Sequence, residues 1–159
     1  MKTKIEKVLE EASVNTFEDV CFMYQAPELN DIQKNLKLEA ASEVKYKGDY
    51  KGKLLIETRG NLFSAIATNI LSKDAPSLRE KKDALGEITN IICGNVVTSL
   101  GRSKLGYRIE SPKAIKKDDL LKEKGQEKPL VKITLNFNEG RADIKFFVKG
   151  YSEVKEKKE

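Results

Sequence analysis

The chain has 159 residues, with 30 lysines and arginines against 25 aspartates and glutamates, and 39% of its residues are hydrophobic. This composition predicts one globular domain over residues 1–159, and no apolar run reaches the roughly 18 residues that a membrane span needs. Histidine is absent, which excludes Ser-His-Asp and Cys-His nucleophile systems and any zinc site that requires imidazole.

The N-terminal segment MKTKIEKVLEEA is charged and amphipathic. Its helical periodicity predicts a helix from about residue 3 to the low twenties, carried by the apolar residues Ile5, Val8, Leu9 and Ala12. The segment lacks the long apolar stretch and the cleavage site of a secretory signal. We therefore expect a cytoplasmic protein, without a membrane anchor.

The middle of the chain predicts a hairpin followed by two helices. Residues 43–58 alternate in polarity around glycines, which is typical of two antiparallel strands, and the turn GDYKGK lacks the spacing of a phosphate-binding loop. Asn61 is the predicted N-cap of a short helix in NLFSAIATNILS. Pro76 is placed to open a long helix from about Ser77 to Leu100, which Gly101 ends.

The C-terminal part predicts three strands. YRIESPKAI reads as a strand with Pro112 at an edge or bulge, and the charged stretch KKDDLLKEKGQEKP reads as a connection. LVKITLNF and ADIKFFVKG flank the turn NEGR, and we expect the charged tail at about 152–159 to fray. The order α-β-β-α-α-β-β-β predicts an α/β fold with helices packed on a mainly antiparallel sheet.

The two cysteines and the distribution of charge lead to two further predictions, one about disulfides and one about nucleic-acid binding. Cys21 and Cys93 lie in apolar-periodic segments far apart, so we expect reduced, buried side chains and no disulfide. Lysines alternate with glutamates throughout the chain, as in EVKEKKE, so the sequence predicts no concentrated basic stripe. The sequence therefore predicts no nucleic-acid partner, despite the net charge of +5.

The long predicted helix has two different faces. Its apolar face carries Leu85, Ile88, Ile92, Val96 and Leu100, and its polar stripe carries Asp83, Glu87, Asn90 and Gly94 at spacings of four, three and four. The stripe could be solvated surface paired with Arg79 and Lys81, or a surface offered to another molecule. Asparagine and glycine are poor helix residues, so Gly94 favours close approach, either by a partner or by another segment of this chain.

The pattern Asp83-x-x-x-Glu87-x-x-Asn90, followed by Pro112, resembles the signature of the CheC, CheX and FliY chemotaxis phosphatases, which remove phosphate from the response regulator CheY. The hairpin with GDYKGKLLIE and the strand with SPKAI come in the order expected for that family. One Glu-x-x-Asn helix is present, so the resemblance is to the single-site CheX type. It implies a CheC-like fold.

The resemblance also implies roles for these residues. Asn90 would orient the hydrolytic water and Glu87 would pair with a lysine of the phosphorylated CheY-like regulator, while Asp83, Gly94 and Pro112 would be supporting residues. No metal or cofactor would be bound by this chain, because Mg²⁺ would be held by the regulator. The resemblance further implies a homodimer, in which a second copy covers an edge of the final strands.

A second hypothesis is a non-catalytic domain of the same fold that binds a phosphorylated regulator or a flagellar component. Glu87 and Asn90 could serve recognition alone, so the sequence leaves this alternative open.

Overall fold

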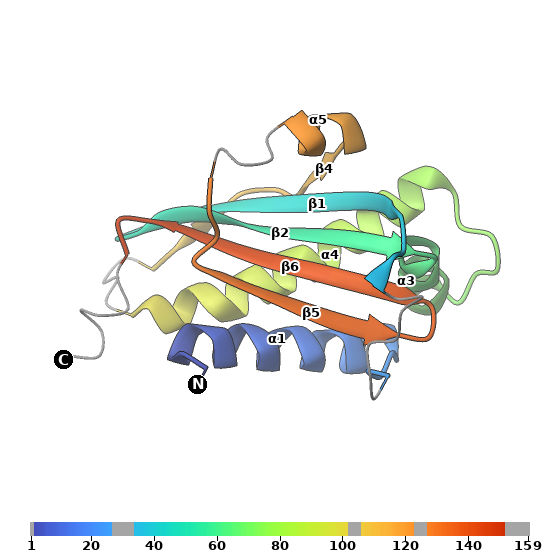
Figure 1. The fold of residues 1–159 in the computed structure, drawn as a ribbon, viewed down its shortest axis with the longest axis horizontal. Coiled ribbons are helices and arrows are strands. Elements are labelled where there is room, and N and C mark those ends of the chain that lie inside the picture. The colour runs from blue at the N-terminus through green and yellow to red at the C-terminus, as the bar shows by residue number, and fades with distance from the viewer. Residues whose placement is uncertain (1, 27–33, 102–105, 123–126, 152–159) are drawn as a thin grey trace.

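A computed structural model describes residues 2–26, 34–101, 106–122 and 127–151 (Figure 1). Its helices are α1 (Lys4–Cys21), α3 (Leu62–Leu71), α4 (Leu78–Val97) and α5 (Lys117–Lys122), with a 3₁₀ turn, η1, at Thr98–Leu100. Its strands are β1 (Leu38–Lys47), β2 (Lys51–Gly60), β3 (Arg108–Ile109), β4 (Lys113–Ile115), β5 (Val131–Phe137) and β6 (Gly140–Lys149). The charged tail at 152–159 lies outside the described residues.

The strands form one antiparallel sheet in the order β3-β1-β2-β6-β5, and β4 also pairs with β1. Helices α1, α3 and α4 cover one face of this sheet, and α5 lies on the opposite side (Figure 1). We call these the helix-covered face and the outer face. The prediction of helices on a mainly antiparallel sheet is confirmed.

The core lies between the sheet and the three helices. Its residues alternate along the strands and recur at helical spacing in α1 and α4, as the two periodicities require, and they include Leu9, Phe17, Leu54, Ile56, Ile88, Ile92, Ile144 and Phe146. The rings of Phe17 and Phe137 lie 4.8 Å apart, joining α1 to the edge strand β5. Fixing α1 and α4 on the same face leaves one side of α4 free of the core.

Two details of the sequence prediction were wrong. The segment 107–115 forms two short strands, because Pro112 between them has no N–H to donate to β1. The stretch expected to be a connection contains α5, whose Leu120 packs near Ala41, Leu55 and Phe147 on the outer face. Asn61 is the N-cap residue of α3, as predicted, although its side chain makes no capping hydrogen bond.

Cys21 and Cys93 are buried and free, as predicted. Burial raises the pKa of each thiol to about 12, so both stay protonated at neutral pH. Among the described residues, no helix is both long enough and apolar enough to cross a membrane.

Candidate functional site

The helix that carries the polar stripe begins at a well-formed cap. The Ser77 hydroxyl accepts a hydrogen bond from the Glu80 backbone N–H, and the Glu80 carboxylate accepts one from the Ser77 N–H. That backbone hydrogen bond, together with one from the Lys73 ammonium, lowers the pKa of Glu80 to about 2. Ser77 is therefore the N-cap, and Pro76 precedes the helix instead of opening it.

The two faces of α4 follow the sequence prediction. Leu85, Ile88 and Ile92 are buried in the core, at 1%, 0% and 0% exposure. Asp83, Glu87 and Asn90, which we call the α4 stripe, are all exposed. The apolar face holds the helix on the sheet and directs the α4 stripe to solvent.

The side chains of the α4 stripe make no hydrogen bond or ion pair with any residue that the structure describes. In particular, Asp83 and Glu87 do not pair with Arg79 or Lys81, the neighbours that a plain solvated surface would use. The carboxylate of Glu87 and the amide of Asn90 thus have all their hydrogen-bonding capacity free for another molecule.

Pro112 borders this helix, and the residue that lets it do so is Gly86. A Cβ atom placed on Gly86 would lie 3.0 Å from Pro112 Cβ and 3.4 Å from its Cγ, so any side chain there would press on the proline ring. Gly86 is buried, one residue before Glu87. Sequence reasoning missed it, although a glycine inside a strongly periodic helix was a visible signal.

Gly94 has a weaker role than the sequence suggested. A Cβ atom there would lie 3.5 Å from Ile109 Cδ1, which is an ordinary van der Waals contact. The segment that approaches this glycine is β3 of the same chain. Of the two explanations for Gly94, approach by another segment of this chain is the observed one.

The segment from β3 to β4 holds Pro112 in place beside α4. Both strands pair with β1, and the Glu110 backbone N–H donates to the Lys45 carbonyl oxygen at 2.9 Å. Pro112 itself is exposed. The structure therefore brings Pro112 next to the helix that carries Asp83, Glu87 and Asn90.

The carboxylates of this surface do not form a metal site. No group of three or more His, Cys, Asp or Glu residues is placed to hold a metal ion within residues 2–26, 34–101, 106–122 and 127–151. The chemistry available on the α4 stripe is hydrogen bonding by an amide and charge pairing by a carboxylate.

A comparison with models of protein families places the chain in one family. The family model described as chemotaxis phosphatase CheX matches residues 40–136, which include α4 and Pro112. The chain belongs to the CheX family. A comparison with curated proteins finds no match by sequence.

Solved structures of CheX proteins share the fold. CheX from Vibrio vulnificus is 17% identical, with a TM-score of 0.69 over 92% of this chain and 97% of that chain. CheX from Desulfovibrio desulfuricans is 19% identical, with a TM-score of 0.69 over 92% and 99%. A CheX–CheY–BeF₃–Mg²⁺ complex from Borrelia burgdorferi is 16% identical in the matched chain, with a TM-score of 0.67 over 92% and 99%. The CheX-like, mainly antiparallel α/β fold is thereby confirmed.

Proposed function

We propose that this CheX-family protein hydrolyses the aspartyl phosphate of a CheY-like response regulator. The observation that carries the proposal is the pair Glu87 and Asn90, exposed one turn apart on α4 and without a partner among the described residues, within a chain that the CheX family model matches. A CheX relative of the same fold has been solved in complex with CheY, BeF₃ and Mg²⁺.

The reaction needs little covalent machinery. Water attacks phosphorus in line with the bond to the aspartyl oxygen, that bond breaks, and the products are the free aspartate carboxylate and inorganic phosphate. Asn90 offers an amide oxygen that accepts a hydrogen bond from the water, and an NH₂ group that donates one. Its role is to hold the water in line with the phosphoryl group.

Glu87 docks the regulator. Its exposed carboxylate pairs with a lysine of the partner and fixes Asn90 in register with the phosphoryl group. Asp83, one turn earlier, contributes at the margin of the contact, and Gly94 and Pro112 shape the surface around it. Mg²⁺ is supplied by the regulator, where it neutralises charge on the phosphoryl oxygens.

The test is the decay of aspartyl phosphate on regulators from the same source, measured by phosphate release with and without this protein. Faster decay on at least one regulator is the expected result. If the protein binds a phosphorylated regulator but changes no decay rate, the alternative of a non-catalytic binding domain takes its place.

Assembly as a homodimer belongs to the same proposal. Strand β5 lies at one end of the described sheet; its Asn136 carbonyl accepts a hydrogen bond from the Ala26 N–H at 2.7 Å, so a second copy would pair with the rest of this edge. Light scattering should give about twice the chain mass of 17.9 kDa. A mass equal to one chain would contradict the dimer without affecting the proposed reaction.

Cytoplasmic localisation also remains our prediction.

A further inference from the structure

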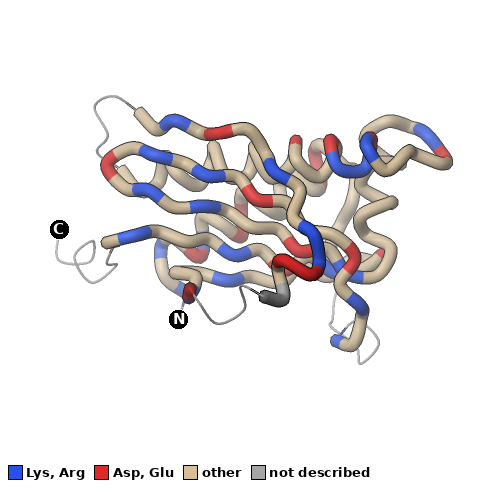
Figure 2. The backbone as a smooth tube through the Cα atoms, turned by 90° about the horizontal axis from the view of Figure 1, so that it is seen from above, with Lys and Arg blue, Asp and Glu red and all other residues tan. Residues whose placement is uncertain are grey.

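The outer face of the sheet carries a second unusual polar surface, at the end where β1 and β2 meet in a hairpin. Figure 2 shows basic positions recurring on adjacent strands at this end. Lys47 of β1 lies directly opposite Lys51 of β2, and Lys51 lies directly opposite Lys149 of β6. Two register positions further along, Lys45 lies opposite Lys53. We call these five residues the lysine rows.

Like charges placed directly opposite each other weaken a sheet, because their Cβ atoms are only about 5 Å apart. Lys51 faces a lysine on both sides. This repulsion destabilises the folded sheet, and a glutamine in place of Lys51 would remove it. Rules of this kind are usually broken where a surface has another task.

The other half of the outer face shows how this sheet balances charge elsewhere. The buried carboxylate of Asp143 accepts hydrogen bonds from Arg59, Arg141 and Thr134, at 3.0, 3.2 and 2.8 Å. Burial alone would raise the pKa of Asp143, but these donors and the Arg141 charge outweigh it and lower the pKa. Arg59, Arg141 and Lys145 there have acidic partners, unlike most of the lysine rows.

Four residues of the lysine rows have no such partner. Lys45, Lys47, Lys51 and Lys149 make no ion pair or hydrogen bond through their side chains with any residue that the structure describes. Lys53 alone is paired, with Glu127 at 3.6 Å, and its ammonium also lies 5.1 Å from the centre of the Phe147 ring. The expectation of no concentrated basic surface, drawn from the sequence, was wrong for this end of the sheet.

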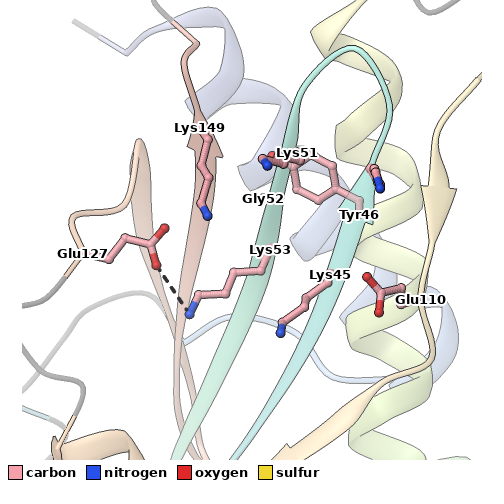
Figure 3. A pocket seen from close by; sticks show the side chains of 9 residues that line it. Lys45, Tyr46, Lys51, Gly52, Lys53, Glu110, Glu127 and Lys149 are labelled. Atoms are coloured by element: carbon pink, nitrogen blue, oxygen red, sulfur yellow. Dashed lines mark ion pairs between the residues drawn. The ribbon is translucent and has the colours of Figure 1, made fainter.

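The lysine rows surround a pocket of about 350 Å³ (Figure 3). Five lysines against two glutamates, Glu110 and Glu127, leave a net charge of +3 on its lining. The volume falls in the range of small-ligand sites. Lysine ammonium groups are compact point charges, each with three donors, and bind phosphate oxygens well.

The lining favours a small anion over a macromolecule. Tyr46 is its one aromatic residue, and it is only 2% exposed, with its hydroxyl donating to the Phe147 carbonyl oxygen at 2.7 Å. A single-stranded nucleic acid would lack an aromatic surface on which to stack its bases. A protein partner would lack an exposed apolar anchor at the centre of the contact.

We infer that the lysine rows bind a small oligophosphate, a ligand with several linked phosphate groups. Neighbouring strands lie about 4.8 Å apart, so the backbones that carry Lys47, Lys51 and Lys149 span about 10 Å across the sheet. A short phosphate chain can run across the strands and meet one ammonium group on each. This site lies on the outer face, whereas the α4 stripe belongs to the helix layer, and the inference does not rest on the phosphatase activity.

The test is isothermal titration calorimetry, in which inorganic triphosphate is added to the full chain at low salt. We expect saturable binding that weakens as potassium chloride is added. The double variant Lys51→Gln/Lys149→Gln should lose about tenfold or more in affinity, since hydrogen bonds to charged groups carry most of the binding. The control Lys117→Gln/Lys132→Gln removes the same charge from exposed positions outside the pocket lining and should bind like the wild type.

Three outcomes would overturn the inference. One is no binding of triphosphate by the folded wild-type chain, and another is an equal loss in both double variants, which would indicate net charge alone. The third comes from parallel arms with phosphatidylcholine vesicles containing phosphatidylglycerol and with a single-stranded oligonucleotide. Binding of either one that depends on Lys51 and Lys149, without binding of triphosphate, would assign the surface to a membrane or to nucleic acid. Circular dichroism of each variant checks that the sheet is intact.

Discussion

The α4 stripe and the lysine rows are both exposed polar surfaces with unused hydrogen-bonding capacity, but they are built differently. On α4, Asp83, Glu87 and Asn90 stand one turn apart on a helix held by its opposite face, so each side chain is placed independently. In the lysine rows, like charges lie directly opposite each other on paired strands. The first surface costs the fold little, while the second weakens it.

This difference predicts opposite responses to mutation. A substitution in the α4 stripe should change function and leave stability alone, because the stripe contributes no packing. A substitution in the lysine rows should raise stability while it lowers affinity for anions. On the α4 stripe each side chain acts individually, whereas in the lysine rows several charges act together.

The largest effect is expected for Asn90→Ala. Removing the amide that orients the water should lower the maximal rate of dephosphorylation by about 10²-fold, the scale seen when one transition-state hydrogen bond is lost. Alanine is a better helix residue than asparagine, so unfolding stability should not fall. The measurement is phosphate release at saturating regulator, with a thermal melt of each variant.

A matched control exists on the same helix. Asn95 is exposed on α4 but lies off the stripe, five residues after Asn90, so Asn95→Ala makes the same chemical change outside the proposed contact. It should keep the wild-type rate. Full turnover by a folded Asn90→Ala protein would show that the amide does not orient the water.

Glu87→Ala is the second prediction, and its effect should fall on binding. Losing a charge-assisted contact to a lysine of the regulator is expected to cost about 1.5 to 3 kcal/mol of affinity if the pair is shielded from water in the complex. The rate at saturating regulator should change less than the rate at low regulator. A binding isotherm with a regulator carrying BeF₃ separates the two effects.

Asp83→Ala is the control for Glu87→Ala, because this substitution removes a carboxylate from the same stripe, one turn away. We expect a loss within about 0.5 kcal/mol, as for surface substitutions in general. Equal losses for Asp83→Ala and Glu87→Ala would mean that the stripe attracts the regulator only through its summed charge.

The sequence predicted α4 and its two faces because a period of 3.6 residues determines both from local spacing alone. It placed Pro112 at a sheet edge for a similarly local reason, the missing N–H. It assigned the close approach to Gly94, yet the tighter contact is at Gly86. The choice between two glycines depends on how β3 and β4 dock beside the helix, which no local pattern states.

The sequence could not place Lys149 among the lysine rows, for the same reason. The hairpin could have placed Lys47 opposite Lys51, since both flank its turn. Adding Lys149 requires that β6, near the end of the chain, pair with β2 in one particular register. Four of the five lysines lie within residues 45–53, where Asp49 is the one acidic residue, so the pairing with the distant strand β6 is needed only to add Lys149.

The smallest effect is expected for Lys51→Gln on stability. Lys51 faces Lys47 on one strand and Lys149 on the other, so removing its charge relieves two repulsive pairs. We expect the free energy of unfolding to rise by about 0.2 to 1 kcal/mol at low salt. The gain should shrink in 1 M potassium chloride, where the screening length falls to about 3 Å.

Lys132→Gln provides the comparison within the same sheet. Lys132 also lies opposite a lysine, but that residue, Lys145, is paired with Glu57 at 2.9 Å, so its charge is already balanced. Urea denaturation of the wild type and of both variants, at low and at high salt, gives the six free energies of unfolding that the comparison needs. A salt-dependent gain for Lys51→Gln and none for Lys132→Gln would mean that the strain comes from unbalanced lysines. A loss of stability in Lys51→Gln at low salt would show that the row is compatible with the sheet, and the cost that sets it apart from the α4 stripe would not exist.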